Sequence, residues 1–276
     1  MHQSSIDKMK AFRDGYLAEF RDSPLEILDI GSRVASRDQP NYRPLFEGPA
    51  WRYTGMDIEP GENVDVPVRN PYDWEEIPSE SFDVAVSGQT LEHVKFFWVT
   101  MFEIVRTLKE GGLACLIAPG AGVEHRFPVD CWRIYRDGMA ALCEFTGVRP
   151  VEVYTQWKWQ YYEDGSGTWK DSCVVLQKPR LTDRERRRFH ERAGMQKRVL
   201  AEGAGGWALA APPSAVPDRR APSAFPEMAS RDIFPRLERE REEDARRRSF
   251  HLRRRLIRKG WKSLLRSFTQ PLGDGW

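Results

Sequence analysis

Two histidines of the sequence stand where they can exchange a proton with a bound molecule. His93 and His125 each follow an apolar run that predicts a strand, and Asp130 comes shortly after His125, where it can orient the imidazole ring. An imidazole can take the proton of a reacting hydroxyl near neutral pH, which contributes roughly 10² to 10⁴-fold to a rate. We favour His125 as this base, with Asp130 assisting it. A loop-tethering role for His125 and a backbone-binding role for His93 remain open alternatives.

Gly31 and Asp57 are suited to bind a nucleoside. Gly31 follows the apolar run at 25–30, and Asp57 ends the next one. In an open α/β sheet the first turn brings backbone amides to a ligand, and an acid after the next strand accepts hydrogen bonds from ribose hydroxyls. The pair predicts a cofactor that contains adenosine. The alternative is a plain turn at Gly31 and a helix cap at Asp57. Arg33 and Ala35 replace the glycines of a dinucleotide site, which favours a cofactor without pyrophosphate.

The segments around these residues alternate in type along the chain. Short apolar runs predict strands over 25–30, 53–58, 82–87 and 113–119, and longer stretches predict helices over 5–21, 90–109 and 137–145. The glycines in 110–112 are expected to end the helix that begins at Thr90. Residues 149–162 and 172–179 predict an antiparallel hairpin joined at 163–167. The alternation predicts an α/β fold with a mostly parallel, Rossmann-like sheet and an antiparallel last strand.

Three aromatic residues alternate near the end of the predicted strand 149–162. Trp157, Trp159 and Tyr161 would share one face of that strand because successive side chains point to opposite sides. Burial in the core is the favoured interpretation, since aromatic strand faces are usually covered. The alternative is an exposed platform for the apolar face of a sugar or for a lipid-linked acceptor.

Composition divides the chain into four parts. Residues 1–22 predict a helix that packs on the core, 23–180 the α/β domain, 181–234 a charged helix followed by a Pro/Gly/Ala-rich linker, and 235–276 a basic, amphipathic helical tail. Residues 181–276 carry 23 Lys and Arg against 13 Asp and Glu, whereas the whole chain carries 43 against 41. The basic tail is therefore expected to have a partner of its own.

The apolar stripe within 246–268 favours contact with a membrane surface. A protein partner or the chain's own core is the competing interpretation, and nucleic acid is the least favoured partner. Four scattered cysteines without zinc spacing, and the lack of a long apolar run, predict a cytoplasmic protein with a peripheral position at the inner membrane face as an option.

Four motifs in order resemble the class I S-adenosylmethionine-dependent methyltransferases over about residues 23–179. They are LDIGS at 28–32, GMDI at 55–58, SFDVAVSGQTLEHV at 81–94 and IVRTLKEGGLACLIAPG at 104–120. The continuation EHRFPVDCWRIYRDGM at 124–139 is similar to a subgroup associated with bacterial glycan and surface-polysaccharide biosynthesis. The resemblance implies the class I methyltransferase sheet and S-adenosylmethionine as the cofactor.

The resemblance also implies which residues hold the cofactor. It places Asp29, Gly31 and Ser32 near the methionine part of the cofactor and Asp57 on the ribose. It places Ile58 and Asp73 around the adenine, and Ser87 and Gln89 beneath the sulfonium. Arg33 and Ala35 differ from the glycine-rich loop of the family at positions that would contact the methionine part of the cofactor.

The expected function is O-methylation of a sugar or glycan intermediate, and a lipid-linked intermediate is one form of this acceptor. A small-molecule or nucleic-acid methyltransferase, or a binding module without turnover, is the alternative. Arg126, Arg133 and Arg136 are available to clamp an acidic acceptor, although exposed arginines are the common case. Glu124, His125 and Asp130 are suited to a divalent metal ion, but such spacing is common by chance, and we predict no metal site.

Overall fold

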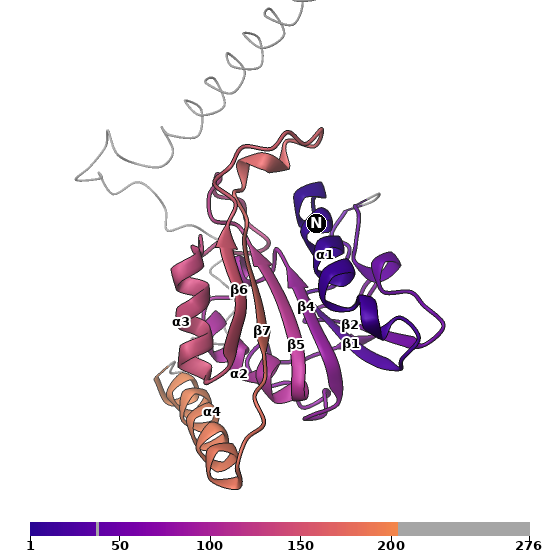
Figure 1. Cartoon of the computed structure of the whole chain (residues 1–276). Helices are drawn as coiled ribbons and strands as arrows, with labels where there is room; N and C mark the ends of the chain where they lie inside the picture. Colours follow the sequence, from indigo (N-terminus) through magenta and orange to yellow (C-terminus); the bar gives the residue numbers. More distant parts are fainter. Residues whose placement is uncertain (37–38, 204–276) are drawn as a thin grey trace, which may run out of the picture. The chain divides into compact units, whose positions relative to one another are not determined.

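A seven-stranded sheet forms the centre of the computed structural model, which describes residues 1–36 and 39–203 (Figure 1). The strands are β1 (Leu25–Ile30), β2 (Trp51–Asp57), β3 (Val66–Pro67), β4 (Phe82–Gly88), β5 (Leu108–Ala118), β6 (Arg149–Thr155) and β7 (Ser172–Gln177). Their order is β3-β2-β1-β4-β5-β7-β6, and β7 runs antiparallel to both of its neighbours while the other pairs are parallel. The predicted fold class is confirmed.

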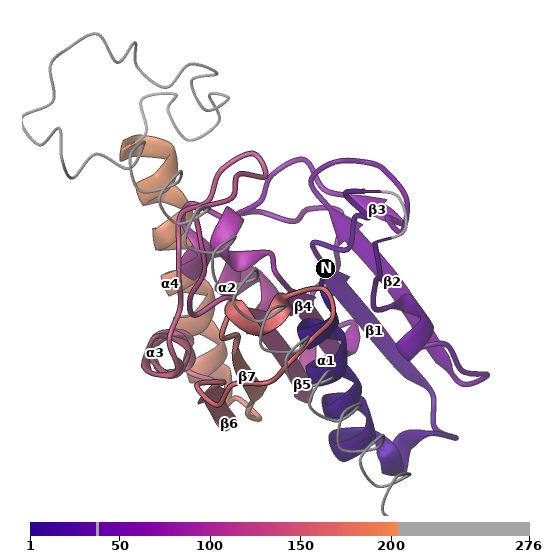
Figure 2. The same ribbon diagram turned by 90° about the horizontal axis from the view of Figure 1, so that it is seen from above.

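Helices cover both faces of this sheet (Figures 1 and 2). They are α1 (Gln3–Tyr16), α2 (Phe97–Thr107), α3 (Arg136–Thr146) and α4 (Asp183–Gly203). Side chains of β1 alternate between two core clusters, because successive residues of a strand point to opposite faces. Leu28 and Ile30 pack in the cluster of α2, α3 and α4, whereas Leu25 and Ile27 pack in the cluster of α1.

The first long helix after β4 is shorter than the sequence predicts. Residues Leu91–His93 form one 3₁₀ turn, and Val94 then returns to extended backbone, so α2 begins at Phe97 and not at Thr90. The glycines at 110–112 do not end the helix, because β5 already starts at Leu108. Gly111, with φ +80°, donates its backbone N–H to Lys178 O at 2.9 Å, so this glycine serves a bend inside the strand.

The predicted core position of three aromatic residues is wrong. Trp157, Trp159 and Tyr161 have exposed fractions of 60%, 52% and 73%. The cause is the end of β6 at Thr155: Gln156 N makes the last bond across to Asp171 O, and Trp157 N donates back to Thr155 O. The chain then leaves the sheet, and residues 156–171 form a long connection instead of the short turn predicted at 163–167.

The charged helix predicted at the start of 181–234 is α4, and it is packed on the core of the α/β domain. Phe189 is 8% exposed, and its ring lies 5.5 Å from that of Phe102 on α2. Lys197 reaches Glu103 of α2 at 2.8 Å. Among the described residues, no helix is both long and apolar enough to cross a bilayer. The tail at 246–268 and the linker beyond Gly203 lie outside the described residues.

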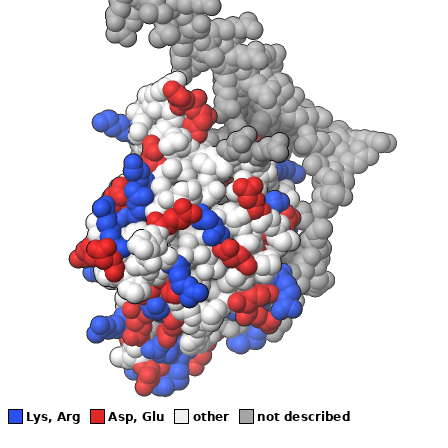
Figure 3. All heavy atoms as spheres, turned by 90° about the vertical axis from the view of Figure 1, so that its right-hand side faces the viewer, with Lys and Arg blue, Asp and Glu red and all other residues white. Residues whose placement is uncertain are grey.

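Acidic and basic side chains are interleaved on the surface drawn in Figure 3. Ion pairs connect the segments that lie between β1 and β3 in the sequence. Arg33 pairs with Glu59 at 2.5 Å, and Arg43 pairs with Asp65 at 2.6 Å. Interleaved charges of both signs are typical of a solvated protein surface.

Candidate active site

The strand order of the sheet reverses between β1 and β4, so their crossovers diverge at the carboxyl ends of these strands. Ligands of open α/β sheets bind at such a point. Gly31 follows β1 there, with φ +73°, and a Cβ on it would lie 2.1 Å from Thr90 Oγ1 of the segment after β4. Gly31 N and Ser32 N both donate to Met56 O of β2, at 2.9 and 3.0 Å. Only glycine fits this turn.

Asp29 lies in β1, two residues before Gly31, and carries an unmatched carboxylate oxygen. Its side chain is buried, and Tyr53 donates its hydroxyl to Oδ2, but Oδ1 has no hydrogen-bond partner. Burial raises the pKa of Asp29 to about 7, even though the bond from Tyr53 acts in the other direction. A buried oxygen without a donor fits the ammonium group of an amino-acid ligand, so this residue suits the methionine part of S-adenosylmethionine.

Asp57 stands at the end of β2 beside this turn, as predicted. Its Oδ2 accepts a bond from Arg33 N at 3.3 Å, and its Oδ1 accepts one from Glu59 N at 3.1 Å. The Arg33 side chain turns toward the loop after β2. Its guanidinium pairs with Glu59, and its Cδ lies close to Gly61, where an added Cβ would be 3.0 Å away. Ile58, next in the chain, is 51% exposed and offers an apolar surface.

Four other predicted cofactor residues have side chains engaged within the fold. Ser32 Oγ donates to Asn63 O, and Ser87 Oγ donates to Ile30 O, each at 2.8 Å. Gln89 Nε2 donates to Asp171 Oδ1 at 3.3 Å. Asp73 accepts a bond from Lys197 of α4 at 2.7 Å. The structure thus brings residues of β1, β2 and β4 to one edge of the sheet, while Asp73 is tied to α4. Their contact with the cofactor stays a prediction.

The two candidate catalytic histidines lie together at the ends of β4 and β5. The ring centroids of His93 and His125 are 5.0 Å apart. His93 Nδ1 donates to Val129 O at 2.6 Å, which leaves its Nε2 without a proton when the ring is neutral. The His125 ring packs 4.7 Å from that of Trp169, on the connection between β6 and β7.

Asp130 lies beside His125, and its role in orienting the ring stays a prediction. Its Oδ2 accepts the backbone N–H of His125 at 2.6 Å and lies 3.3 Å from His125 Nδ1. Arg133 binds both oxygens of Asp130, at 2.6 and 2.7 Å. Burial acts to raise the pKa of Asp130, but the bonds from Arg133 and His125 outweigh it and hold the pKa below its usual value. Arg133 is therefore committed to Asp130 and is not a free clamp for an acidic acceptor.

Glu92 is the residue that sequence reasoning missed. Its side chain is fully buried, neither carboxylate oxygen has a hydrogen-bond partner, and burial raises its pKa to about 8. Oε1 lies 3.7 Å from His93 Nε2. The one available signal was an acid next to a histidine in the motif LEHV, directly after a strand.

The acid–histidine group differs from the metal-ligand set considered from the sequence. Glu124 pairs with Arg126 at 2.9 Å on the surface. In the described ranges, Glu92, His93 and His125 instead place one potential ligand atom each within 4.8 Å of one another.

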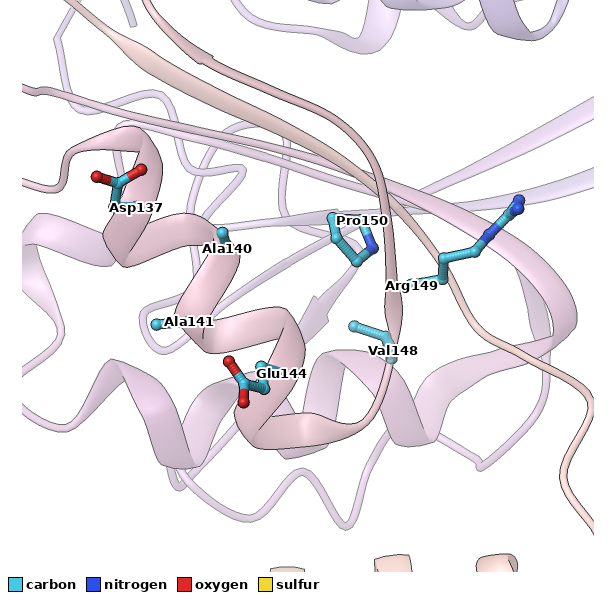
Figure 4. Close-up of a pocket in the computed structure, with 7 residues that line it drawn as sticks. All are labelled: Asp137, Ala140, Ala141, Glu144, Val148, Arg149 and Pro150. Atoms are coloured by element: carbon cyan, nitrogen blue, oxygen red, sulfur yellow. The ribbon is translucent and has the colours of Figure 1, made fainter.

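A separate open depression lies beside the edge strand β6 (Figure 4). It is lined by residues of α3, by the residue before β6 and by the first two residues of β6, namely Asp137, Ala140, Ala141, Glu144, Val148, Arg149 and Pro150. None of the predicted site residues lines it, so it is distinct from the group at the carboxyl ends of the strands.

Comparison with known proteins identifies the domain. Residues 41–116 match the family model described as a methyltransferase domain, a range that includes Asp57 and Glu92. A search of curated proteins finds no match.

Similar solved structures have low sequence identity to this chain. One is the Burkholderia thailandensis 1,6-didemethyltoxoflavin-N1-methyltransferase (15% identity, TM-score 0.47, 64% of this chain and 79% of that chain). Others are a putative sarcosine dimethylglycine methyltransferase from Galdieria sulphuraria (11%, 0.46, 65% and 92%) and a SAM-dependent methyltransferase from Methanosarcina mazei (16%, 0.46, 60% and 97%). The family match shows that residues 41–116 belong to a methyltransferase domain, and the enzyme is therefore a transferase that uses S-adenosylmethionine.

Proposed function

We propose that the enzyme transfers a methyl group to a hydroxyl oxygen of a sugar or glycan intermediate. The observation that carries this proposal is the position of His125 between Asp130 and the aromatic connection 156–171. That connection supplies Trp169 to the His125 ring and exposes Trp157, Trp159 and Tyr161 to solvent. The C–H face of a sugar ring is apolar, and exposed aromatic rings offer a matching surface with little conformational freedom to lose.

The chain's own part in the chemistry is to position the acceptor and take its proton. S-adenosylmethionine, when bound, supplies an electrophilic methyl group on its sulfonium. A hydroxyl needs to lose its proton as its oxygen bonds to carbon, and His125 is the proton acceptor in this proposal. The carboxylate of Asp130 stabilises the imidazolium that results, and Arg133 keeps that carboxylate ionised and in place. Holding the oxygen in line with the methyl group contributes the rest of the acceleration.

Cofactor binding is assigned to the turn after β1 and the end of β2. We propose that Asp29 Oδ1, which has no donor among the described residues, accepts the ammonium group, and that Asp57 accepts the ribose hydroxyls. The backbone amides around Gly31 and the exposed Ile58 complete this surface.

The test is methyl transfer to candidate acceptors with isotope-labelled S-adenosylmethionine. Surface-glycan fractions and their sugar precursors are incubated with the enzyme, and the labelled product is located by mass spectrometry. A labelled O-methyl sugar is the expected result. His125→Ala is expected to lower turnover and to leave affinity for S-adenosylhomocysteine unchanged, whereas His190→Ala, at an exposed histidine of α4, leaves both unchanged. Methylation of nitrogen or carbon in small molecules, with no labelled glycan, contradicts the proposal.

We also propose that the tail at 246–268 holds the enzyme at the cytoplasmic membrane surface, close to lipid-linked acceptors. Its support is the sequence alone, where basic residues flank an apolar stripe. Sedimentation with anionic and with neutral vesicles, for the full chain and for a chain ending at 234, tests it. Selective binding of the full chain to anionic vesicles is expected, and equal sedimentation of both chains opposes the idea.

A further inference from the structure

Three side chains from two separate segments converge beside the proposed acceptor position. Glu92 and His93 come from the 3₁₀ turn after β4, and His125 comes from the segment after β5. One carboxylate oxygen and one nitrogen of each ring lie within 4.8 Å of one another. Residues that are distant in sequence thus present three good metal ligands to one point.

The buried carboxylate of Glu92 indicates what this point is built to hold. A carboxyl group removed from water is expected to find hydrogen bonds, yet both oxygens of Glu92 are buried without a partner in residues 1–36 and 39–203. His93 Nε2, at 3.7 Å from Oε1, is too distant for a hydrogen bond. Two ligands that are each about 2.0–2.2 Å from one ion lie roughly 3 to 4 Å apart, so this separation suits two ligands of the same ion.

The groups behind the histidines match the supports that metal-binding imidazoles use. A ligating histidine usually donates its second N–H to a backbone carbonyl or a carboxylate, which fixes the ring and its tautomer. His93 donates Nδ1–H to Val129 O at 2.6 Å, so its Nε2 lone pair is directed at the Glu92 side. His125 Nδ1 lies 3.3 Å from Asp130 Oδ2 without a hydrogen bond between them, so this carboxylate is near the ring but only the support of His93 is complete.

We infer that Glu92, His93 and His125 bind one divalent transition-metal ion of the Zn²⁺ type. Two imidazoles and one carboxylate favour Zn²⁺ and its first-row neighbours over Mg²⁺ and Ca²⁺, which prefer oxygen ligands. Three protein ligands leave a coordination position open. This inference rests on the proposed function only for the acceptor: if a sugar hydroxyl binds at the open position, its proton passes to solvent water, and His125 serves as a ligand in place of the base role proposed above.

The test is metal binding by the full-length protein after dialysis against a chelator. Isothermal titration with Zn²⁺ is expected to give one ion per chain, and titration with Mg²⁺ is expected to give no comparable binding. Glu92→Gln keeps the side-chain volume and removes the charge, and it is expected to weaken Zn²⁺ binding by about tenfold or more, as is His93→Ala. His190→Ala is the matched control and is expected to bind Zn²⁺ like the wild type. Circular dichroism of each variant checks that it is folded.

A second readout concerns the ligands themselves. Co²⁺ in place of Zn²⁺ is expected to give a visible absorption spectrum that changes in His93→Ala and not in His190→Ala. Zn²⁺ binding that is weak in the wild type, or equally strong in folded Glu92→Gln and His93→Ala, overturns the inference.

Methyl transfer separates this inference from the proposed function. Glycan methylation that continues in the presence of chelator, by a protein that binds no Zn²⁺, overturns the metal site and leaves the function intact. Zn²⁺ bound through the three residues, with no methylated glycan found, supports the metal site and contradicts the function.

Discussion

Asp57 is the residue on which the cofactor assignment can be tested with least ambiguity. Its carboxylate accepts two backbone N–H groups, which fix its orientation at the end of β2, and it has no charged partner among the described residues. Arg33, in the turn, pairs with Glu59 instead. The Asp57 oxygens thus stay available to accept further hydrogen bonds from a ribose diol.

Replacing Asp57 with Ala is expected to weaken binding of S-adenosylhomocysteine. Leaving polar groups unmatched typically costs about 1 to 3 kcal/mol, which corresponds to roughly a 5- to 150-fold rise in Kd. Isothermal titration measures this change. Glu62→Ala, an exposed acid of the same loop, is the matched control and is expected to bind like the wild type. Equal affinities for the Asp57 variant and the control contradict the ribose assignment.

Asp29 is expected to make stability depend on pH. Its folded-state pKa of about 7 lies above its usual value of 3.8, so the folded protein keeps a proton that the unfolded chain loses. The contribution is complete below pH 4 and is lost progressively as the pH rises to about 7. Asp29→Asn removes this contribution. Urea unfolding of both proteins between pH 4 and 8 is expected to show a falling free energy of unfolding in the wild type that is flatter in the variant. Parallel profiles contradict a buried, protonated Asp29.

Helix α4 is expected to contribute to the core of the methyltransferase domain. Phe189 is 8% exposed and packs against Phe102 and the α2–α3 side of the sheet. Phe189→Ala is expected to lower the free energy of unfolding by about 3 to 5 kcal/mol, the usual cost for a buried Phe. Met195→Ala on the same helix, where Met195 is 52% exposed, is expected to cost much less. Equal costs indicate that α4 unfolds independently of the domain.

Substitutions at exposed residues of the connection 156–171 are expected to change acceptor binding without changing stability. Trp157 is 60% exposed, so Trp157→Ala is expected to change the free energy of unfolding by about 0.5 kcal/mol or less, while it raises the KM for the acceptor. Tyr162, which is 8% exposed in the same segment, is the contrasting position, and its truncation to Ala is expected to destabilise the fold. Thermal unfolding and steady-state kinetics measure both effects. A large loss of stability in Trp157→Ala indicates burial of that ring.

Local pattern predicted the strands and the glycine turn well. The apolar run at 25–30 forms β1 because both faces of a central parallel strand are covered. Gly31 has the positive φ that a tight turn requires. The proximity of His125 and Asp130 also follows from their short separation along one segment.

Other features depend on contacts that no local pattern contains. The aromatic alternation continues past Thr155, so the strand period gave no sign that the chain leaves the sheet there. Glu92 became notable through its burial without partners, which only the folded chain reveals. The bond between Asp73 and Lys197 joins residues from distant parts of the sequence, so no local pattern predicts it.

The sheet as a whole brings the residues of the candidate site to the carboxyl ends of its parallel strands. Because β1, β2, β4 and β5 are parallel, their carboxyl ends meet at the same side, and the reversal of strand order between β1 and β4 opens a site there. Asp29, Gly31 and Asp57 lie on the β1–β2 half, and Glu92, His93 and His125 lie on the β4–β5 half, with Ser87 and Gln89 at the end of β4 between them. In the proposed function, the methyl donor binds over the first group and the acceptor beside the second.

Hydrogen exchange with and without S-adenosylhomocysteine locates the bound cofactor on the full-length protein. Slower exchange is expected for the backbone amides of residues 30–35 and 57–63, which follow β1 and β2, because a ligand restrains the segments that it contacts. Residues 137–150, around the depression beside β6, are expected to exchange at the same rate in both states. Protection confined to 137–150, or no change in 30–35 and 57–63 at saturating ligand, contradicts a cofactor site at the ends of β1 and β2.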